Sequence, residues 1–434
     1  MKLTIPRKPL LEALASIKSA TGRSMPILSC VAISTFEKSA ELVCCNLDLT
    51  LRAKLDCDIA KRGETCVPVT LFHDLVKSFT GETVELETEK SGLNIVCGTS
   101  RYTLAMLPVG EFPPAPSFRN AQEFELPQAV LRSLLASTSY CASTDDARYI
   151  IQSSLLRLNG NVTVVSTDGR RLGLDSADIT GLKVGSAKKA VDYILPSSAV
   201  RELIRLLPVA DDAEKEKDQP VRILTSENLC RFHMPGRGSV GDIVLTTKLV
   251  EGQYPNYAQV IPSIRGKKPI AIGRADLLGC LQRTALISDN VKLAFHKQSL
   301  TITAVNEKGL GQAEESLLIA PAEKLTMVFN VHYLIEALAS VSDDEVQFYG
   351  AGVGEPGVLH VAGKAWTSVI MPKGKADDKP KADAKPAAEP DAAAPAGAVG
   401  KPADAKAAPA PKAEVAKPVA AKVTPKPEPV AAGK

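Results

Sequence analysis

The chain of 434 residues is long enough for two to four ordinary domains with buried cores. Apolar residues make up 45% of the chain, aromatic residues only 4%, and the formal net charge is +3. No stretch approaches the roughly 18 consecutive apolar residues that would cross a bilayer. The opening MKLTIPRKPLLEALASIKS is too polar for the core of a signal peptide. We therefore expect a cytoplasmic, globular protein.

The net charge is divided unevenly along the chain. From Lys373 onward there are 12 lysines and 8 acidic residues, which gives +4 and leaves −1 for residues 1–372. The segment 374–434 is built of Ala, Pro, Lys, Glu and Asp, with no large apolar side chain beyond Val. Such a segment cannot offset an ordering cost of roughly 1–2 kcal/mol per residue, so we predict a disordered tail. Because the body is not basic overall, any nucleic-acid binding depends on where its charges lie.

Nine cysteines are scattered through the body with no C-x-x-C pair and no neighbouring histidine cluster. An odd number with this spacing fits neither a disulfide framework nor a zinc site. We expect buried, reduced thiols and no metal or other cofactor.

One pattern occurs six times: a short apolar strand, a breaker residue and an amphipathic helix. The breakers are Pro6, Pro68, Pro127, Pro196, Gly273 and Asn330. After each breaker, the fourth, seventh and eighth residues are apolar, which is the spacing of a helix buried on one face.

Alternating strand segments with Gly- or Asn-rich turns lie between these helices, as antiparallel hairpins require. The breakers stand 62, 59, 69, 77 and 57 residues apart. We therefore predict an α+β fold of three similar domains, each with two helices packed on antiparallel sheets. The predicted domains cover 1–118, 119–249 and 250–373, and the tail covers 374–434.

The helix faces opposite the apolar stripes carry charges of both signs. Basic side chains are Lys8, Lys77, Arg132, Arg201 and Arg205, and acidic ones are Glu12, Asp74, Glu202 and Glu336. An ordinary solvated helix surface explains this mixture. Charge alone favours that interpretation; the functional alternative is a sparse lining that contacts phosphates without reading bases.

Several collinear segments resemble the bacterial DNA sliding clamp family, the beta subunit of DNA polymerase III. They are MKLTIPRKPLLEAL (1–14), RYTLAMLPVGEFP (101–113), VSTDGRRLGL (165–174), LTTKLVEGQYPNYAQVIP (245–262) and TSVIMP (367–372). The resemblance implies a non-catalytic processivity factor. Two copies close head to tail into a homodimeric ring around double-stranded DNA, without sequence preference.

The resemblance also implies a cleft for short peptides carrying Leu and Phe, supplied by the polymerase, the clamp loader and other partners. Its expected lining is Ile151, Thr167, Gly169, Arg170, Arg171, Leu172, Pro255, Val260, Val369, Ile370, Met371 and Pro372. Aliphatic walls suit such anchors, and arginines supply polar contacts at the rim.

Two further sets of residues follow from the resemblance and the helix pattern. Expected DNA contacts are Arg23, Lys77, Arg132, Tyr149, Arg201 and Arg205. Expected dimer contacts are Arg101, Tyr102, Leu104, Glu314 and Glu315, with the strand 101–104 pairing against the third domain of the partner subunit.

The chain departs from the family pattern at the cleft. Arg170 stands where histidine is usual, Gln259 where arginine is common, and the chain continues past Lys373. A divergent paralogue that serves another polymerase or repair therefore remains an alternative.

An enzyme is the other alternative. Asp168 with Arg170 and Arg171 could handle a phosphate, and GAGVGEPG (350–357) resembles a glycine-rich nucleotide loop. That loop is followed by the strand-like VLHVAG and not by a helix, so we interpret it as a hairpin. We expect no catalytic residue.

Overall fold

The fold is described from a computed structural model of the protein, for residues 1–178, 191–209, 219–236, 240–350, 352 and 354–373. Within these ranges, six α-helices each follow directly on a strand. They are α1 (Arg7–Ile17), α2 (Val69–Ser78), α3 (Gln128–Ala136), α4 (Ser197–Leu206), α6 (Arg274–Ala285) and α7 (Val331–Ala339). The predicted tail, 374–434, lies outside the described residues.

Each of the six breaker residues is the N-cap of its helix, so the repeat predicted from the sequence is confirmed. The four prolines have φ between −57° and −63°, the value that their rings impose. Their ψ angles are extended, which ends the strand and starts the helix at the next residue. At α7 the cap is polar instead, because the Asn330 side chain accepts a hydrogen bond from His332 N.

The predicted apolar stripes are the buried faces of these helices. Of the eighteen stripe positions, all are buried except Leu75 and Ile204, which are half-buried. Burying a leucine-sized side chain stabilises a fold by about 1.5–3 kcal/mol, so these stripes fix which side of each helix meets the sheets.

In the described residues, the strands form four antiparallel sheets. A five-stranded sheet has the order β5 (Asp58–Lys61), β1 (Lys2–Pro6), β7 (Thr83–Glu89), β8 (Gly92–Cys97) and β9 (Ser100–Leu104). A first eight-stranded sheet has the order β10 (Gln122–Leu126), β15 (Val221–Thr225), β16 (Leu229–Met234), β17 (Ile243–Lys248), β4 (Leu49–Asp56), β3 (Ser39–Cys45), β2 (Cys30–Thr35) and β6 (Glu64–Pro68).

The second eight-stranded sheet has the order β14 (Val191–Pro196), β11 (Ser153–Leu158), β12 (Val162–Thr167), β13 (Arg171–Ala177), β23 (Thr367–Ile370), β22 (Gly357–His360), β21 (Glu345–Tyr349) and β18 (Ile270–Gly273). The long strands β19 (Asn290–Val305) and β20 (Gln312–Asn330) pair with each other. The segment around GAGVGEPG joins β21 to β22, which pair antiparallel, so it belongs to a hairpin as predicted.

Both large sheets are continuous between domains. β17 of the second domain pairs with β4 of the first, from Ile243 opposite Ala53 to Thr247 opposite Leu49. β13 of the second domain pairs with β23 of the third, from Arg171 opposite Ile370 to Leu174 opposite Thr367. Main-chain hydrogen bonds therefore join each domain to the next.

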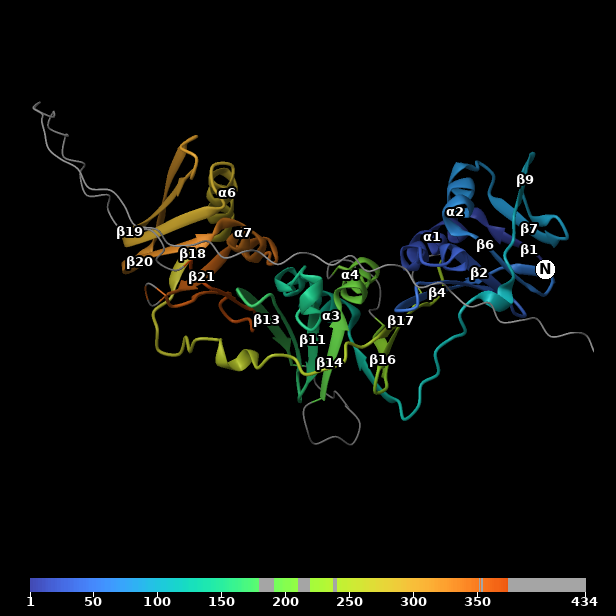
Figure 1. Cartoon of the computed structure of the whole chain (residues 1–434), viewed down its shortest axis with the longest axis horizontal. Coiled ribbons are helices and arrows are strands. Elements are labelled where there is room, and N and C mark those ends of the chain that lie inside the picture. The colour runs from blue at the N-terminus through green and yellow to red at the C-terminus, as the bar shows by residue number, and fades with distance from the viewer. Residues whose placement is uncertain (179–190, 210–218, 237–239, 351, 353, 374–434) are drawn as a thin grey trace, which may run out of the picture. The chain divides into compact units, whose positions relative to one another are not determined.

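The helices pack in three pairs, α1 with α2, α3 with α4 and α6 with α7, which Figure 1 draws side by side. Each pair lies on one domain and covers sheets with its apolar stripes, which gives three similar α+β domains as predicted. No helix in the described part of the chain has the length and apolar character needed to span a membrane.

The buried stripe yields a matched test on α3. Replacing Leu131, which is fully buried, by alanine should lower the free energy of unfolding by about 3 kcal/mol, because the substitution leaves a cavity in the core. Ser133→Ala on the exposed face of the same helix should change it by less than about 0.5 kcal/mol. Urea denaturation followed by circular dichroism measures both. Equal effects would contradict the assigned helix orientation.

Candidate partner-binding cleft

The candidate site is built around the tight turn between β12 and β13. Gly169 has φ +85°, a left-handed conformation that favours glycine. The Asp168 carboxylate accepts hydrogen bonds from Arg170 N at 2.8 Å and Arg171 N at 2.9 Å. Thr167 Oγ1 donates to Arg171 O at 2.7 Å. This turn holds the side chains at positions 170 and 171 in fixed places.

Beside the turn lies a cavity of about 210 Å³ whose surface is almost entirely apolar. It is lined by Ile151, Thr167, Gly169, Arg170, Arg171, Leu172, Pro255, Asn256, Tyr257, Val260, Val369 and Met371. These residues come from the second domain, the segment that follows it and the last strand of the third domain. Its size suits one or two apolar side chains of a peptide.

Ten of the twelve residues expected in the cleft line this cavity. Ile370 does not, because side chains alternate along a strand and Ile370 points into the core of the third domain, where it is 1% exposed. Pro372 is also absent from the lining. The sequence reasoning missed Asn256 and Tyr257, although both lie in the segment 245–262 that carried part of the resemblance.

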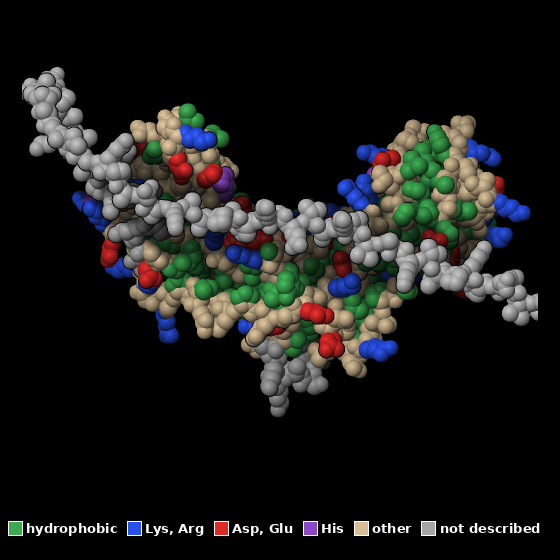
Figure 2. All heavy atoms as spheres, viewed as in Figure 1, with side chains coloured by type: hydrophobic (Ala, Val, Ile, Leu, Met, Phe, Trp, Pro, Cys, Tyr) green, Lys and Arg blue, Asp and Glu red, His purple; other side chains and the backbone are tan. Residues whose placement is uncertain are grey.

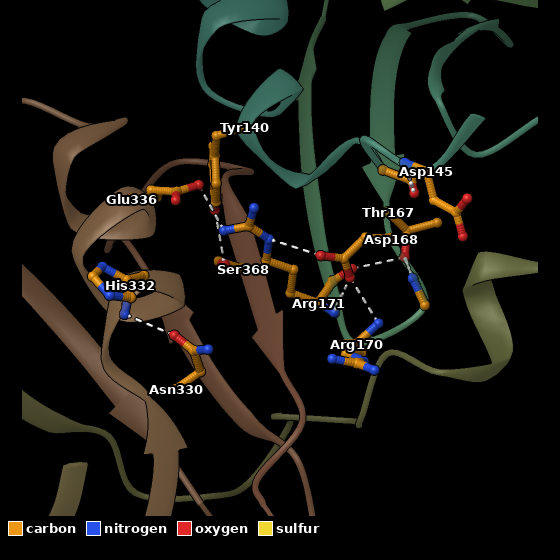
Figure 3. A network of polar contacts seen from close by, with 12 residues as sticks. Tyr140, Asp145, Thr167, Asp168, Arg170, Arg171, Asn330, His332, Glu336 and Ser368 are labelled. Atoms are coloured by element: carbon orange, nitrogen blue, oxygen red, sulfur yellow. Dashed lines mark hydrogen bonds and ion pairs between the residues drawn. The ribbon is translucent and has the colours of Figure 1, made fainter. Parts of the chain in front are cut away.

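Arg171 links the cleft to the third domain (Figure 3). Its side chain is only 9% exposed, and it pairs with Asp168 at 3.1 Å and with Glu336 of α7 at 2.7 Å. Its guanidinium also lies over the rings of Tyr333, at 4.4 Å, and Tyr140, at 5.6 Å. Charge pairs and aromatic faces together compensate for removing this cation from water.

Two further hydrogen bonds join the same pair of domains. Tyr140 Oη donates to Ser368 Oγ at 2.9 Å, and Trp366 Nε1 donates to Ser137 O at 3.0 Å. With the β13–β23 pairing, they hold the two sides of the cleft together. The neighbouring Cys141 is buried, and burial raises the pKa of its thiol to about 12. It is therefore a packing residue and not a nucleophile.

Two larger cavities, of about 550 and 390 Å³, lie along residues 249–257. The acidic residues Asp192, Glu227 and Glu251 are among those that line the larger one. The smaller one is lined in part by Arg157, whose guanidinium donates two hydrogen bonds to the Asp192 carboxylate. Volume alone would favour these cavities, but the apolar character of the 210 Å³ cleft makes it the better fit for Leu and Phe anchors.

The expected DNA contacts differ in how available they are. Arg23, Lys77 and Arg201 are exposed, and Tyr149 is 59% exposed. Arg132 is half-buried and donates through Nε to Ile204 O at 3.1 Å.

Arg205 is engaged with its neighbours. It pairs with Glu202 at 2.6 Å and donates to Ser16 O and Ser19 Oγ of the first domain, so it connects α4 to α1. In Figure 2, basic and acidic side chains are interspersed and do not form one basic patch on the face in view.

The expected dimer contacts also divide into two groups. β9 is an edge strand, and Arg101 and Tyr102 are exposed on it, whereas Leu104 is buried in the core of the first domain. Glu314 is exposed.

Glu315 is held by Arg283 of its own chain at 2.6 Å. Hydrogen bonds from Arg283 and Cys280 lower the pKa of Glu315 to about 2. Because Glu315 already has a partner in its own chain, it is less available than Glu314 for the expected dimer contact.

The described part of the chain contains no group of three His, Cys, Asp or Glu side chains that could hold a metal ion. The nine cysteines are all free thiols, and all but Cys57 are buried. The prediction of buried thiols is therefore confirmed for every cysteine except Cys57, which is half-buried.

Three family models match the chain in order: the N-terminal domain of the DNA polymerase III beta subunit over 1–116, its central domain over 125–256 and its C-terminal domain over 258–373. The beta sliding clamp of Proteus mirabilis is 30% identical over 383 residues, which cover 86% of this chain and 99% of that protein. The beta sliding clamp of Escherichia coli K12 is 27% identical with the same coverage.

The solved structure of the DNA polymerase III subunit beta from Pseudomonas aeruginosa is 28% identical and superposes with a TM-score of 0.77. The match covers 86% of this chain and all of that one. A structure of the clamp from the same organism bound to griselimycin is also 28% identical, with a TM-score of 0.78 and coverage of 86% and 99%.

Three similar two-helix domains joined through continuous sheets define the class of DNA sliding clamps. The chain belongs to the DNA polymerase III beta-subunit family, the bacterial sliding clamps. It acts as a processivity factor that works with a DNA polymerase on DNA.

The Arg171 contacts predict a cost for breaking the link between the second and third domains. Arg171→Ala should lower the free energy of unfolding by about 2–3 kcal/mol, because it removes the guanidinium from two carboxylates and two rings. Lys364→Ala, which breaks the exposed pair with Asp343, should cost less than about 1 kcal/mol. Urea titration of the two variants gives the comparison, and similar losses would refute a structural role for Arg171.

Proposed function

We propose that two copies of the chain close head to tail into a ring around duplex DNA and that the ring tethers a polymerase without catalysing a reaction. The proposed domains are 1–118, 119–249 and 250–373, followed by the tail. Twelve repeat helices, six from each copy, would face the duplex. Because it would act on DNA together with a polymerase, we expect the protein in the cytoplasm.

The observation that carries this proposal is the equivalence of the six strand–cap–helix units. Each unit buries one helix face and leaves the other for solvent, so similar surfaces recur along the body. Exposed residues such as Lys77 and Arg201 would contact phosphates weakly and without reading bases. Weak contacts are compatible with sliding, since tight or base-specific ones would stop it.

Partners would be held at the apolar cleft beside the β12–β13 turn. We propose that peptides from the polymerase, the clamp loader and other partners insert Leu and Phe anchors between Leu172, Pro255, Val260 and Val369. The griselimycin-bound structure of the Pseudomonas aeruginosa clamp supports the idea that a clamp of this fold takes a ligand other than DNA.

The ring would close where β9 meets the third domain of the partner subunit. An edge strand offers unpaired main-chain groups to another strand, and β9 also exposes Tyr102. The third domain exposes apolar side chains that a partner could cover. They are Leu286, Val305, Leu310 and Leu318, with exposures of 84%, 63%, 81% and 91%.

Topological retention is tested by loading the protein onto nicked circular DNA with a clamp loader and then cutting the circle once. The loaded protein should remain on intact circles through gel filtration and leave the linear DNA, because free ends let a ring slide off. Proteins bound at both ends should restore retention. Equal retention on circular and linear DNA would contradict encirclement.

The proposed dimer interface is tested by Tyr102→Glu. A buried carboxylate without a partner disfavours association, so this variant should be mostly monomeric at micromolar concentration in multi-angle light scattering. Phe36→Glu, which changes another exposed aromatic residue of the first domain, should remain dimeric. Unchanged melting temperatures would show that both variants fold. A dimeric Tyr102→Glu protein would argue against this interface.

A further inference from the structure

Two adjacent arginines in the β12–β13 turn have opposite surroundings. Arg171 is buried and held by Asp168 and Glu336, as described above. Arg170 is exposed, and within the described residues no ion pair or side-chain hydrogen bond engages its guanidinium. Figure 3 draws the Arg171 side chain toward Glu336 and the Arg170 side chain away from it. Arg171 therefore has a structural role, and Arg170 is available to a ligand.

The backbone of Arg170 is fixed although its side chain is not. Its N–H donates to the Asp168 carboxylate at 2.8 Å, and its carbonyl oxygen accepts from Met371 N at 2.9 Å. Residue 170 also lines the apolar cleft together with Met371 and Val260. An exposed arginine with a fixed backbone thus lines a cavity whose surface is mostly apolar.

Three carboxylates near the cleft residues in sequence already have partners within the chain. Asp145 lies 3.5 Å from Arg148, and Asp146 accepts a hydrogen bond from Gln152 Nε2 at 2.8 Å. Asp168 is bonded to the turn and to Arg171. Among the described residues, neither these acids nor any other carboxylate forms an ion pair with the Arg170 guanidinium.

We propose that Arg170 is a specificity-determining residue that selects peptides with a carboxylate next to the apolar anchors. A guanidinium can donate two parallel hydrogen bonds to a carboxylate, and nearby aliphatic walls strengthen such a contact by excluding water. This inference rests on the proposed peptide-binding role of the cleft. The carboxylate has two possible sources, an Asp or Glu side chain or the C-terminus of the partner peptide.

Three fluorescent peptides with the same Leu and Phe anchors test the proposal on the full-length protein. The first carries one Asp between the anchors and an amidated C-terminus, the second has Asn in place of Asp, and the third combines Asn with a free C-terminal carboxylate. Fluorescence anisotropy gives the Kd of each peptide. The wild-type protein should bind the Asp peptide about fivefold more tightly than its Asn counterpart.

Variants of Arg170 test whether its guanidinium causes the preference for the Asp peptide. Arg170→Gln should abolish the preference for the Asp peptide, so that the Kd values of the Asp and Asn peptides agree within about twofold. Arg170→Lys should keep part of the preference, because it retains the charge but not the planar pair of donors. Arg62→Gln, at a 62% exposed arginine of the first domain, should behave as wild type.

The binding data distinguish a failure of Arg170 selectivity from a failure of peptide binding at the cleft. If the third peptide binds more tightly than the second and loses this advantage in Arg170→Gln, the C-terminus is a source of the carboxylate. Equal weakening of all three peptides by Arg170→Gln, or no preference in the wild type, would overturn the selectivity of Arg170. Failure of the wild type to bind any of the peptides would overturn peptide binding at the cleft itself.

Discussion

Two antiparallel strand pairings, β17 with β4 and β13 with β23, are the interactions on which the rest of the structure depends. Each joins the sheet of one domain to the sheet of the next through main-chain hydrogen bonds, which also cover strand edges that would otherwise be open. The helix pairs are thereby carried on one connected framework. A ring that holds DNA by enclosure needs such a framework, because its retention depends on closed geometry more than on contact energy.

The second of these pairings also creates the cleft. β23 brings Val369 and Met371 beside the turn of the second domain, so the cleft forms only where the two domains meet. Arg171 strengthens the junction through its ion pairs with Asp168 and Glu336, while Arg170 is exposed. Two adjacent arginines therefore differ in role: the contacts of Arg171 commit it to the fold, and the lack of an ion pair among the described residues leaves Arg170 free to bind a ligand.

Most of the fold could be predicted from the sequence because it repeats. The breakers and apolar stripes depend on local geometry, so all six caps, including Gly273 and Asn330, were predictable. The contacts that depend on distant partners were not. The pairing of Glu315 with Arg283 and the link from Arg205 to α1 join residues that no periodicity connects. The inward orientation of Ile370 follows from strand register, which the motif TSVIMP does not reveal.

We propose that enclosure of the duplex, and not tight contact with it, holds the protein on DNA. The most direct test is the residence time of the loaded protein on closed circular DNA as the salt concentration is raised from about 0.05 to 0.2 M. A protein that grips six to ten phosphates would lose roughly 10³–10⁵ in affinity over this range. Our account predicts a residence time that changes by no more than a few-fold. A fall of several orders of magnitude would contradict it.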